Sequence, residues 1–139
     1  MKLQDFVPNL PADAPDIGEV LLDAESIEWR EKSLAGLYEK LLWRDDETGA
    51  TIALIRFDEG AGIPDPHKHA SNQFMFMLEG RYEYTATGIT LTPGSFYWNP
   101  KGHVHGPTVA HEKTVFLEMY DGPHYPERPS WYSSDEDAR

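Results

Sequence analysis

Short β-prone runs, separated by glycine- and proline-rich turns, fill the middle of this chain and restrict its fold more than any other feature. Ala50–Phe57 is rich in β-branched and apolar residues, and the turn residues Glu47-Thr48-Gly49 stand in front of it. Thr114–Tyr120 is a second run of the same kind. No clear helical segment lies between such runs, so the sequence predicts an all-β barrel or jelly roll.

Further strands are predicted by the same signals. Gln73–Leu78 and Arg81–Ala86 lie on either side of Glu79-Gly80, a pattern typical of a β-hairpin. Three shorter candidates are Glu19–Asp23, Ile89–Leu91 and Phe96–Trp98.

One segment, residues 34–44, fits either a helix or a strand. Its apolar residues match one face of a helix, and periodicity alone does not decide between the two structures. These residues are Leu34, Leu37, Tyr38, Leu41 and Leu42. Gly36 and the turn-rich stretch 45–49 weaken the helix, so we predict a strand over Tyr38–Arg44.

The two ends of the chain differ from the middle in composition. Residues 1–17 carry several prolines and are expected to form an extended arm. Residues 123–139 end in a run of serines and acidic residues, which predicts a polar, frayed tail. The sequence has no internal repeat and no interior linker, so residues 18–122 are predicted to form one barrel domain.

Charge and composition exclude several classes of partner and site. The formal net charge of -12 disfavours nucleic acids and anionic membrane surfaces, because both bind mainly through cationic side chains. No run approaches the roughly 18 apolar residues of a membrane span. The absence of cysteine excludes thiolate zinc sites and cysteine nucleophiles. No apolar signal core follows Met1–Asp5, so we expect a cytoplasmic protein.

Four of the six histidines form two His-x-His pairs, His67/His69 and His103/His105. Residues two apart on a strand project from the same face, so each pair can point at a common centre. Neutral imidazole is the commonest metal ligand in proteins. The alternative interpretation of such a pair is a polar patch on an exposed strand.

The spacing around these pairs is more specific. His67-Lys68-His69 is followed after three residues by Gln73 and after six more by Gly80. This stretch resembles the first motif of the cupin superfamily, in which two histidines precede a glutamate and a glycine.

The second cupin motif is matched about a hairpin later. Gly94 is followed after five residues by Pro100-Lys101-Gly102, and after two more by His105. The resemblance implies a double-stranded β-helix (jelly-roll) barrel of the RmlC-like cupin type. It also implies one divalent transition metal ion, held by His67, His69, Gln73 and His105.

A narrower group of cupins is similar over residues 29–122. This group includes the ChrR anti-sigma-factor domain and dihydroxyacetophenone dioxygenase. The matching strings are Glu47-Thr48-Gly49-Ala50, Ala61-Gly62-Ile63-Pro64 and Met77-Leu78-Glu79-Gly80.

Gln73 departs from the family, which has a glutamate at this position. An amide cannot neutralise a divalent ion, so the site would keep a formal charge near +2 and favour an anionic or bidentate oxygen ligand. Fe, Zn, Ni and Mn all remain possible occupants. The alternative is that Gln73 does not ligate and three histidines hold the ion alone.

Other residues are candidates for the surroundings of the ion. If Gln73 faces inward, strand alternation predicts that Met75 and Met77 do so too. The predicted substrate pocket consists of Met75, Met77, Phe96, Trp98 and Met119. The alternative is that most of the apolar and aromatic residues form barrel core.

Three candidate catalytic residues carry groups that can exchange or donate a proton. His103 is a candidate acid, base or support for a ligand, or else a loop histidine. Tyr82 and Tyr84 could donate hydrogen bonds to a bound oxygen. His111 and His124 have no spacing argument, and we expect both to be solvated.

Three functions follow from the resemblance. The first is a metalloenzyme acting on a small oxygenated substrate, best described as a C–C cleaving dioxygenase. The second is a metal-dependent lyase or isomerase of a sugar acid, and the third is a small-molecule or stress-sensing module without turnover. The resemblance also implies a homodimer, because cupins commonly pair through their sheets.

Overall fold

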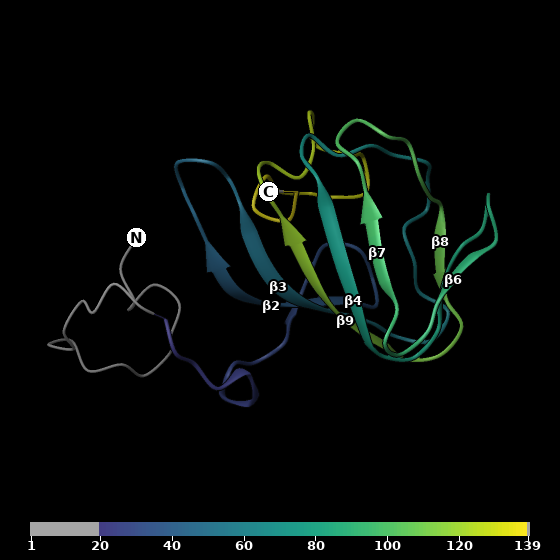
Figure 1. Cartoon of the computed structure of the whole chain (residues 1–139), viewed down its shortest axis with the longest axis horizontal. Coiled ribbons are helices and arrows are strands. Elements are labelled where there is room, and N and C mark those ends of the chain that lie inside the picture. Colours follow the sequence, from purple (N-terminus) through teal and green to yellow (C-terminus); the bar gives the residue numbers. More distant parts are fainter. Residues whose placement is uncertain (1–19, 139) are drawn as a thin grey trace, which may run out of the picture.

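The computed structural model describes residues 20–138, which form two antiparallel β-sheets (Figure 1). The larger sheet has the order β1 (Arg30–Glu31), β2 (Leu37–Arg44), β3 (Thr51–Phe57), β9 (Thr114–Tyr120), β4 (Gln73–Glu79) and β7 (Phe96–Asn99). The smaller sheet has the order β6 (Ile89–Leu91), β5 (Tyr82–Tyr84) and β8 (Thr108–Ala110). In the described part of the chain the helical element is a single 3-10 turn, η2 (Ala24–Ser26).

Strand alternation places the core between the two sheets. Along β3, every second side chain is buried, from Thr51 to Phe57. The ring of Tyr82 in the smaller sheet packs at 5.1 Å from Phe57 and 5.5 Å from Phe116 in the larger one. The predicted all-β jelly roll is therefore confirmed.

The ambiguous segment around Tyr38 is a strand, as predicted. β2 begins one residue earlier, at Leu37, and pairs along β3, with a register shift between Leu41 and Trp43. Its inward residues Leu37 and Glu39 are buried, so tertiary packing overrides the helical periodicity.

The strand predicted over Glu19–Asp23 is wrong in its described part. Residues 20–23 have no strand partner. The Asp23 side chain instead accepts a hydrogen bond from the Glu25 N–H and so caps the η2 turn. The predicted arm over residues 1–17 lies outside the described residues.

The C-terminal segment, drawn in yellow in Figure 1, is packed rather than frayed. Tyr132 and Ala138 belong to the buried hydrophobic cluster. Asp137 accepts hydrogen bonds from Arg30 Nη1 at 2.7 Å and from the Ser33 N–H at 2.7 Å. The prediction failed because serine and acidic composition does not reveal that one carboxylate is itself buried and has partners far away in the sequence.

Gly80 lies in the turn between β4 and β5 and shows why the motif needs glycine there. Its φ of +91° is in the left-handed region, and an added Cβ would lie 2.3 Å from the carbonyl oxygen of Lys113. Only a residue without a side chain lets the β4–β5 turn approach the start of β9 this closely.

Candidate metal centre

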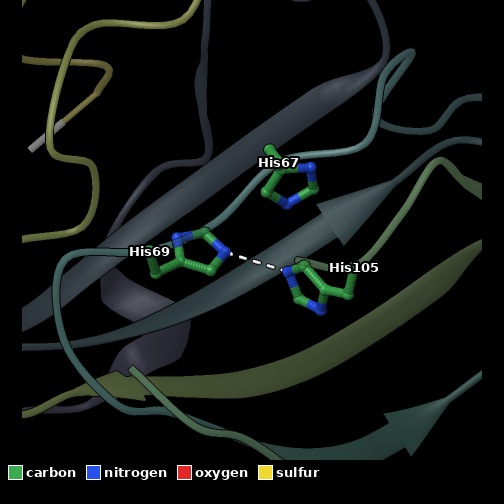
Figure 2. Close-up of side chains that lie close together, drawn as sticks. All are labelled: His67, His69 and His105. Carbon is green, nitrogen blue, oxygen red and sulfur yellow. Dashed lines mark hydrogen bonds between the residues drawn. The ribbon is translucent and has the colours of Figure 1, made fainter. Parts of the chain in front are cut away.

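Three imidazoles, those of His67, His69 and His105, lie close together (Figure 2). Their potential ligand atoms all lie within 4.8 Å of one another. The segments that carry them are joined by backbone hydrogen bonds. His67 N donates to His105 O at 2.8 Å, and His105 N donates to His67 O at 2.9 Å.

Hydrogen bonds to backbone carbonyls fix the tautomers of two of these rings. Nδ1 of His67 lies 2.9 Å from the carbonyl oxygen of Asp65, and Nδ1 of His69 lies 2.8 Å from that of His124. A carbonyl only accepts, so each Nδ1 must carry the proton. Each Nε2 therefore keeps its lone pair for a metal ion.

The third ring, that of His105, bonds a hydroxyl group, which can either donate or accept a hydrogen bond. Its Nδ1 lies 2.9 Å from the Tyr97 hydroxyl, and its Nε2 lies 3.0 Å from Nε2 of His69. Because Nε2 of neutral His69 can only accept, neutral His105 donates from Nε2 while the Tyr97 hydroxyl donates to Nδ1. A metal ion would replace the proton between the two rings, and the hydroxyl can then accept from Nδ1 instead.

Burial keeps the three imidazoles neutral. It lowers the pKa of His69 to about 3 and, with the positive charge that His67 could carry, the pKa of His105 to about 2. The pKa of His67 is also lowered, chiefly by burial. Neutral imidazole is the metal-binding form, so these rings need lose no charge to accept an ion near neutral pH.

Gln73 completes the candidate ligand set. Its Nε2 donates to Glu118 Oε2 and to the Tyr120 hydroxyl, both at 2.9 Å. Its Oε1 is buried without a hydrogen-bond partner among the described residues, and the side chain lines the same cavity as the three histidines. A buried amide oxygen without a partner beside three neutral imidazoles fits a divalent transition metal.

The cavity around these groups is small. Its volume is about 40 Å³, and its lining also includes Met75, Tyr84 and Tyr125. A buried water needs roughly 10–15 Å³, so the cavity holds an ion and very few small ligands. An open groove of about 450 Å³ lies outside it and shares the His67 side chain. The other groove residues are Lys68, Tyr125, Pro126, Glu127, Arg128, Pro129 and Trp131.

Tyr82 and Tyr84, two predicted catalytic residues, line the inner cavity. The Tyr82 hydroxyl lies 2.6 Å from Thr108 Oγ1, and the Tyr84 hydroxyl donates to Met75 Sδ at 3.3 Å. The Tyr84 ring stacks on His105 at 4.8 Å. Burial raises the pKa of both hydroxyls, so they stay protonated and can act as donors.

Several predicted pocket residues lie elsewhere. Phe96 and Trp98 are 65% and 53% exposed, and Met119 is also exposed, because their strands present these residues on the outer face. The inward residues of β7 are Tyr97 and Asn99, one position out of phase with the prediction. Met77 is buried in the core and does not line the inner cavity.

Of the three remaining histidines, one is placed as predicted and two are not. His103 is exposed in a turn, where its Nδ1 bonds Asn99 Oδ1 at 2.8 Å, and it lines neither cavity. His111 is exposed and bonds Glu83, as expected of a solvated residue. His124, also expected to be solvated, is buried, with its Nε2 2.6 Å from Thr51 Oγ1.

Sequence reasoning missed Tyr97, Glu118, Tyr120 and Tyr125 as parts of the site. Glu118 and Tyr120 had a usable signal, because they alternate with Phe116 along β9 and share its inward face. Tyr125 had none, since it belongs to a segment predicted to be frayed.

The match to the ChrR cupin-like domain family spans residues 18–124. This chain belongs to that family. Both of its histidine motifs fall within the matched residues. No curated protein matches the sequence of this cupin. Among residues 20–138, the cupin has no helix long and apolar enough to cross a bilayer.

Solved structures similar to this cupin include an acetylacetone dioxygenase candidate from Methylibium petroleiphilum, with 19% identity and a TM-score of 0.70 over 84% of this chain and 85% of that one. An acetylacetone dioxygenase from Acinetobacter johnsonii has 21% identity and a TM-score of 0.63, over 83% of this chain and 79% of that one. The polyketide cyclase RemF from Streptomyces resistomycificus has 20% identity and a TM-score of 0.63, over 84% of this chain and 89% of that one. At these identities the similarity shows the shared fold alone.

The histidine cluster predicts the metal content of the protein. Purified without added metal or an affinity tag, the wild type should hold about one equivalent of a transition metal, and His69→Ala or His105→Ala should lose it. His111→Ala, which removes an exposed histidine outside the cluster, should retain it. Elemental analysis checks this, and unchanged metal in His69→Ala would contradict the assignment.

The buried Asp137 carboxylate predicts a pH-dependent contribution to stability. Burial opposes its ionisation, but hydrogen bonds from Ser33 and Arg30 outweigh burial and lower its pKa to about 2 from 3.8. Since the folded pKa lies below the unfolded one, this stabilisation is full above pH 3.8 and is lost as the pH falls toward 2. Asp137→Asn should cost about 2 kcal/mol at pH 7 and less below pH 4.

Urea unfolding of wild type and variant at several pH values measures this difference. Asp135→Asn, two residues away, is the control. The Asp135 side chain is exposed, and its ion pair with Arg128, at 3.6 Å, lies at the surface and contributes little to stability. Equal effects of the two substitutions would contradict a specific role for Asp137.

Proposed function

We propose that this cupin is a mononuclear metalloenzyme that cleaves a C–C bond of a small oxygenated substrate with O₂. The observation that carries the proposal is the convergence of three neutral imidazoles and the unpartnered Gln73 oxygen on one small cavity. These are the donors that suit a divalent ion such as Fe(II).

Four neutral donors favour a particular kind of substrate. A redox-active ion bound here would supply the site at which a chelating oxygen ligand and O₂ meet. Because His67, His69, His105 and Gln73 bring no negative charge, an anionic, bidentate ligand such as the enolate of a 1,3-diketone is favoured. The fold similarity to one acetylacetone dioxygenase and to one candidate for that activity supports this substrate class.

The outer groove supplies the route of entry. The Tyr125 and Trp131 rings line it, and they lie 6.0 and 5.6 Å from the ring of His67. A substrate of more than a few atoms exceeds the inner cavity, so its body lies in the groove and only its oxygen donors reach past His67. The Tyr84 hydroxyl, which also lines the inner cavity, would exchange its weak bond to Met75 Sδ for one to a substrate oxygen.

Gln73 also favours a second candidate, a redox-neutral lyase or isomerase acting on a sugar acid. An amide in place of the glutamate departs from the two-histidine, one-carboxylate set of many iron oxygenases. The likeness in fold to the polyketide cyclase RemF supports redox-neutral chemistry, since the two chains match over most of their length.

Oxygen consumption separates the candidates. The Fe(II)-loaded protein should consume one O₂ per molecule of acetylacetone and place both oxygen atoms in the two fragments. The His69→Ala variant, treated identically, should consume none. Anaerobic turnover of a sugar acid would favour the lyase or isomerase instead. Tight binding of a small molecule without any turnover would favour a sensing module.

We also propose that two copies of the chain pair through the outer face of the larger sheet. This face exposes large apolar side chains, which are Phe76, Leu78, Phe96, Trp98 and Met119. The small-molecule ligand and cytoplasmic location stay predictions from the sequence.

The dimer predicts a mass in solution of twice 15.8 kDa. Phe96→Asp with Trp98→Asp should give a monomer, because two carboxylates would be buried in an apolar interface. Ile89→Asp, at an exposed residue of the smaller sheet, should stay dimeric. Light scattering after size exclusion measures the mass, and a monomeric wild type would refute the pairing.

A further inference from the structure

Glu118 is a carboxylate that lines the metal cavity without being among the predicted ligands. It lies on β9, where it pairs in register with Met75 of β4, while Tyr120 pairs with Gln73. These four side chains therefore occupy the same inner face of the larger sheet, and Glu118 reaches the Gln73 amide from the neighbouring strand.

The contact fixes which end of the amide is free. Glu118 Oε2 lies 2.9 Å from Gln73 Nε2, and the Tyr120 hydroxyl lies at 2.9 Å from the same nitrogen. An ionised carboxylate has no proton to donate, so the end of the amide beside it must be the N–H end. The remaining end, Oε1, is left buried and unbonded in the cavity that the three histidines line.

We propose that Glu118 is the positioning residue that requires an amide at position 73: it holds Gln73 Nε2 so that Oε1 is presented to the metal ion. It also supplies, one hydrogen bond farther out, the negative charge that a carboxylate ligand would bring. This inference rests on the metal site of the proposed function and not on the reaction.

A glutamate at position 73 would be incompatible with this arrangement. Its carboxylate would lie at hydrogen-bond distance from that of Glu118, and two like charges at this separation repel strongly inside a protein. A glutamine avoids the repulsion and gains a charge-assisted hydrogen bond. The departure of this chain from the cupin motif therefore has a partner on the adjacent strand.

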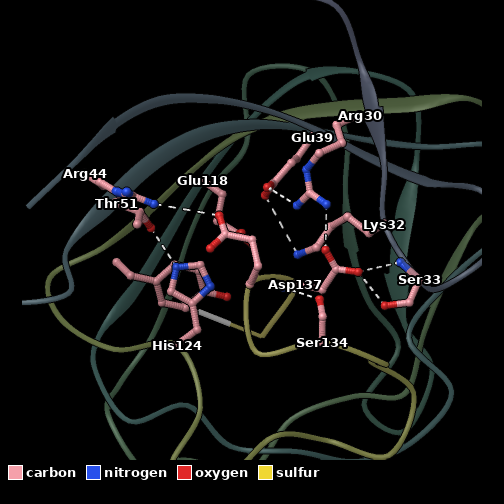
Figure 3. Close-up of polar contacts among 12 residues, drawn as sticks. Arg30, Lys32, Ser33, Glu39, Arg44, Thr51, Glu118, His124, Ser134 and Asp137 are labelled. Carbon is pink, nitrogen blue, oxygen red and sulfur yellow. Dashed lines mark hydrogen bonds and ion pairs between the residues drawn. The ribbon is translucent and has the colours of Figure 1, made fainter. Parts of the chain in front are cut away.

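Further charged groups lie beyond the Glu118 carboxylate (Figure 3). Burial raises the pKa of Glu118, and the positive charge of Lys32, which lines the same cavity, opposes this shift and favours the ionised form. Lys32 Nζ also lies 3.8 Å from Glu39 Oε2, and Arg30 joins Glu39 to Asp137 with two contacts of 2.7 Å. The negative charge beside Gln73 therefore has a nearby counter-charge, Lys32, which is itself paired with Glu39.

A double-mutant cycle tests the proposal. The four proteins are the wild type, Gln73→Glu, Glu118→Gln and the variant with both substitutions. Each is stripped of metal, and its dissociation constant for Zn(II) is measured by competition with a chelator. The thermal midpoint of each metal-free protein is recorded in parallel.

The effect of Glu118→Gln on Zn(II) affinity should have opposite signs in the wild-type and Gln73→Glu backgrounds. In the wild-type background, Glu118→Gln should weaken Zn(II) binding about 10-fold, because the amide loses its fixed orientation and the site loses a nearby charge. In the Gln73→Glu background, the same substitution should strengthen binding about 10-fold, because it converts repulsion into a hydrogen bond. In the metal-free proteins, Gln73→Glu should lower the midpoint by roughly 5 °C, and adding Glu118→Gln should restore most of it.

Glu79→Gln is the matched control, since Glu79 is exposed at the end of β4. Its ion pair with Lys113, at 3.8 Å, lies at the surface and is weak. This substitution should change neither the dissociation constant for Zn(II) nor the thermal midpoint of the metal-free protein. Effects of Glu118→Gln that have the same sign in both backgrounds would overturn the inference while leaving the metal site intact. A wild type that binds no Zn(II), Fe(II), Ni(II) or Mn(II) would overturn the proposed function and this inference together.

Discussion

The paired backbone hydrogen bonds between His67 and His105 are the contact on which the site depends. They join two segments far apart in the sequence, at 2.8 and 2.9 Å, outside any of the named strands. Once this bridge is formed, the rings of His67, His69 and His105 share one cavity, and carbonyls or a tyrosine hydroxyl fix their Nδ1 atoms. The orientation of the three rings is therefore set by hydrogen bonds within the chain.

Much of this arrangement could be predicted from the sequence, because it is encoded by local spacing. The His-x-His pairs, Gly80 and the alternating runs of β3, β4 and β9 all reflect periodicity or turn geometry. What could not be predicted depends on phase and on long-range partners. In β7 an aromatic run of three gives no sign of which residue faces inward, and Tyr97 rather than its neighbours contacts His105.

The charges of the site are distributed in layers. Neutral donors lie next to the cavity, a carboxylate lies behind the glutamine, and cations from the N-terminal half lie beyond it. A sequence motif describes only the innermost layer. The glutamine at position 73 looks like a loss of charge when the motif is considered alone, whereas the adjacent strand carries a carboxylate within hydrogen-bond distance of it.

The packed C-terminal segment has a practical consequence. Tyr125 contributes to the wall of both the inner cavity and the outer groove, and Asp137 ties the last residues to the N-terminal part of the barrel. A shortened version trimmed to the end of the last strand would lose a wall of the site together with its anchoring carboxylate. Crystallisation and fusion designs should therefore keep this acidic segment and attach any tag at the opposite end.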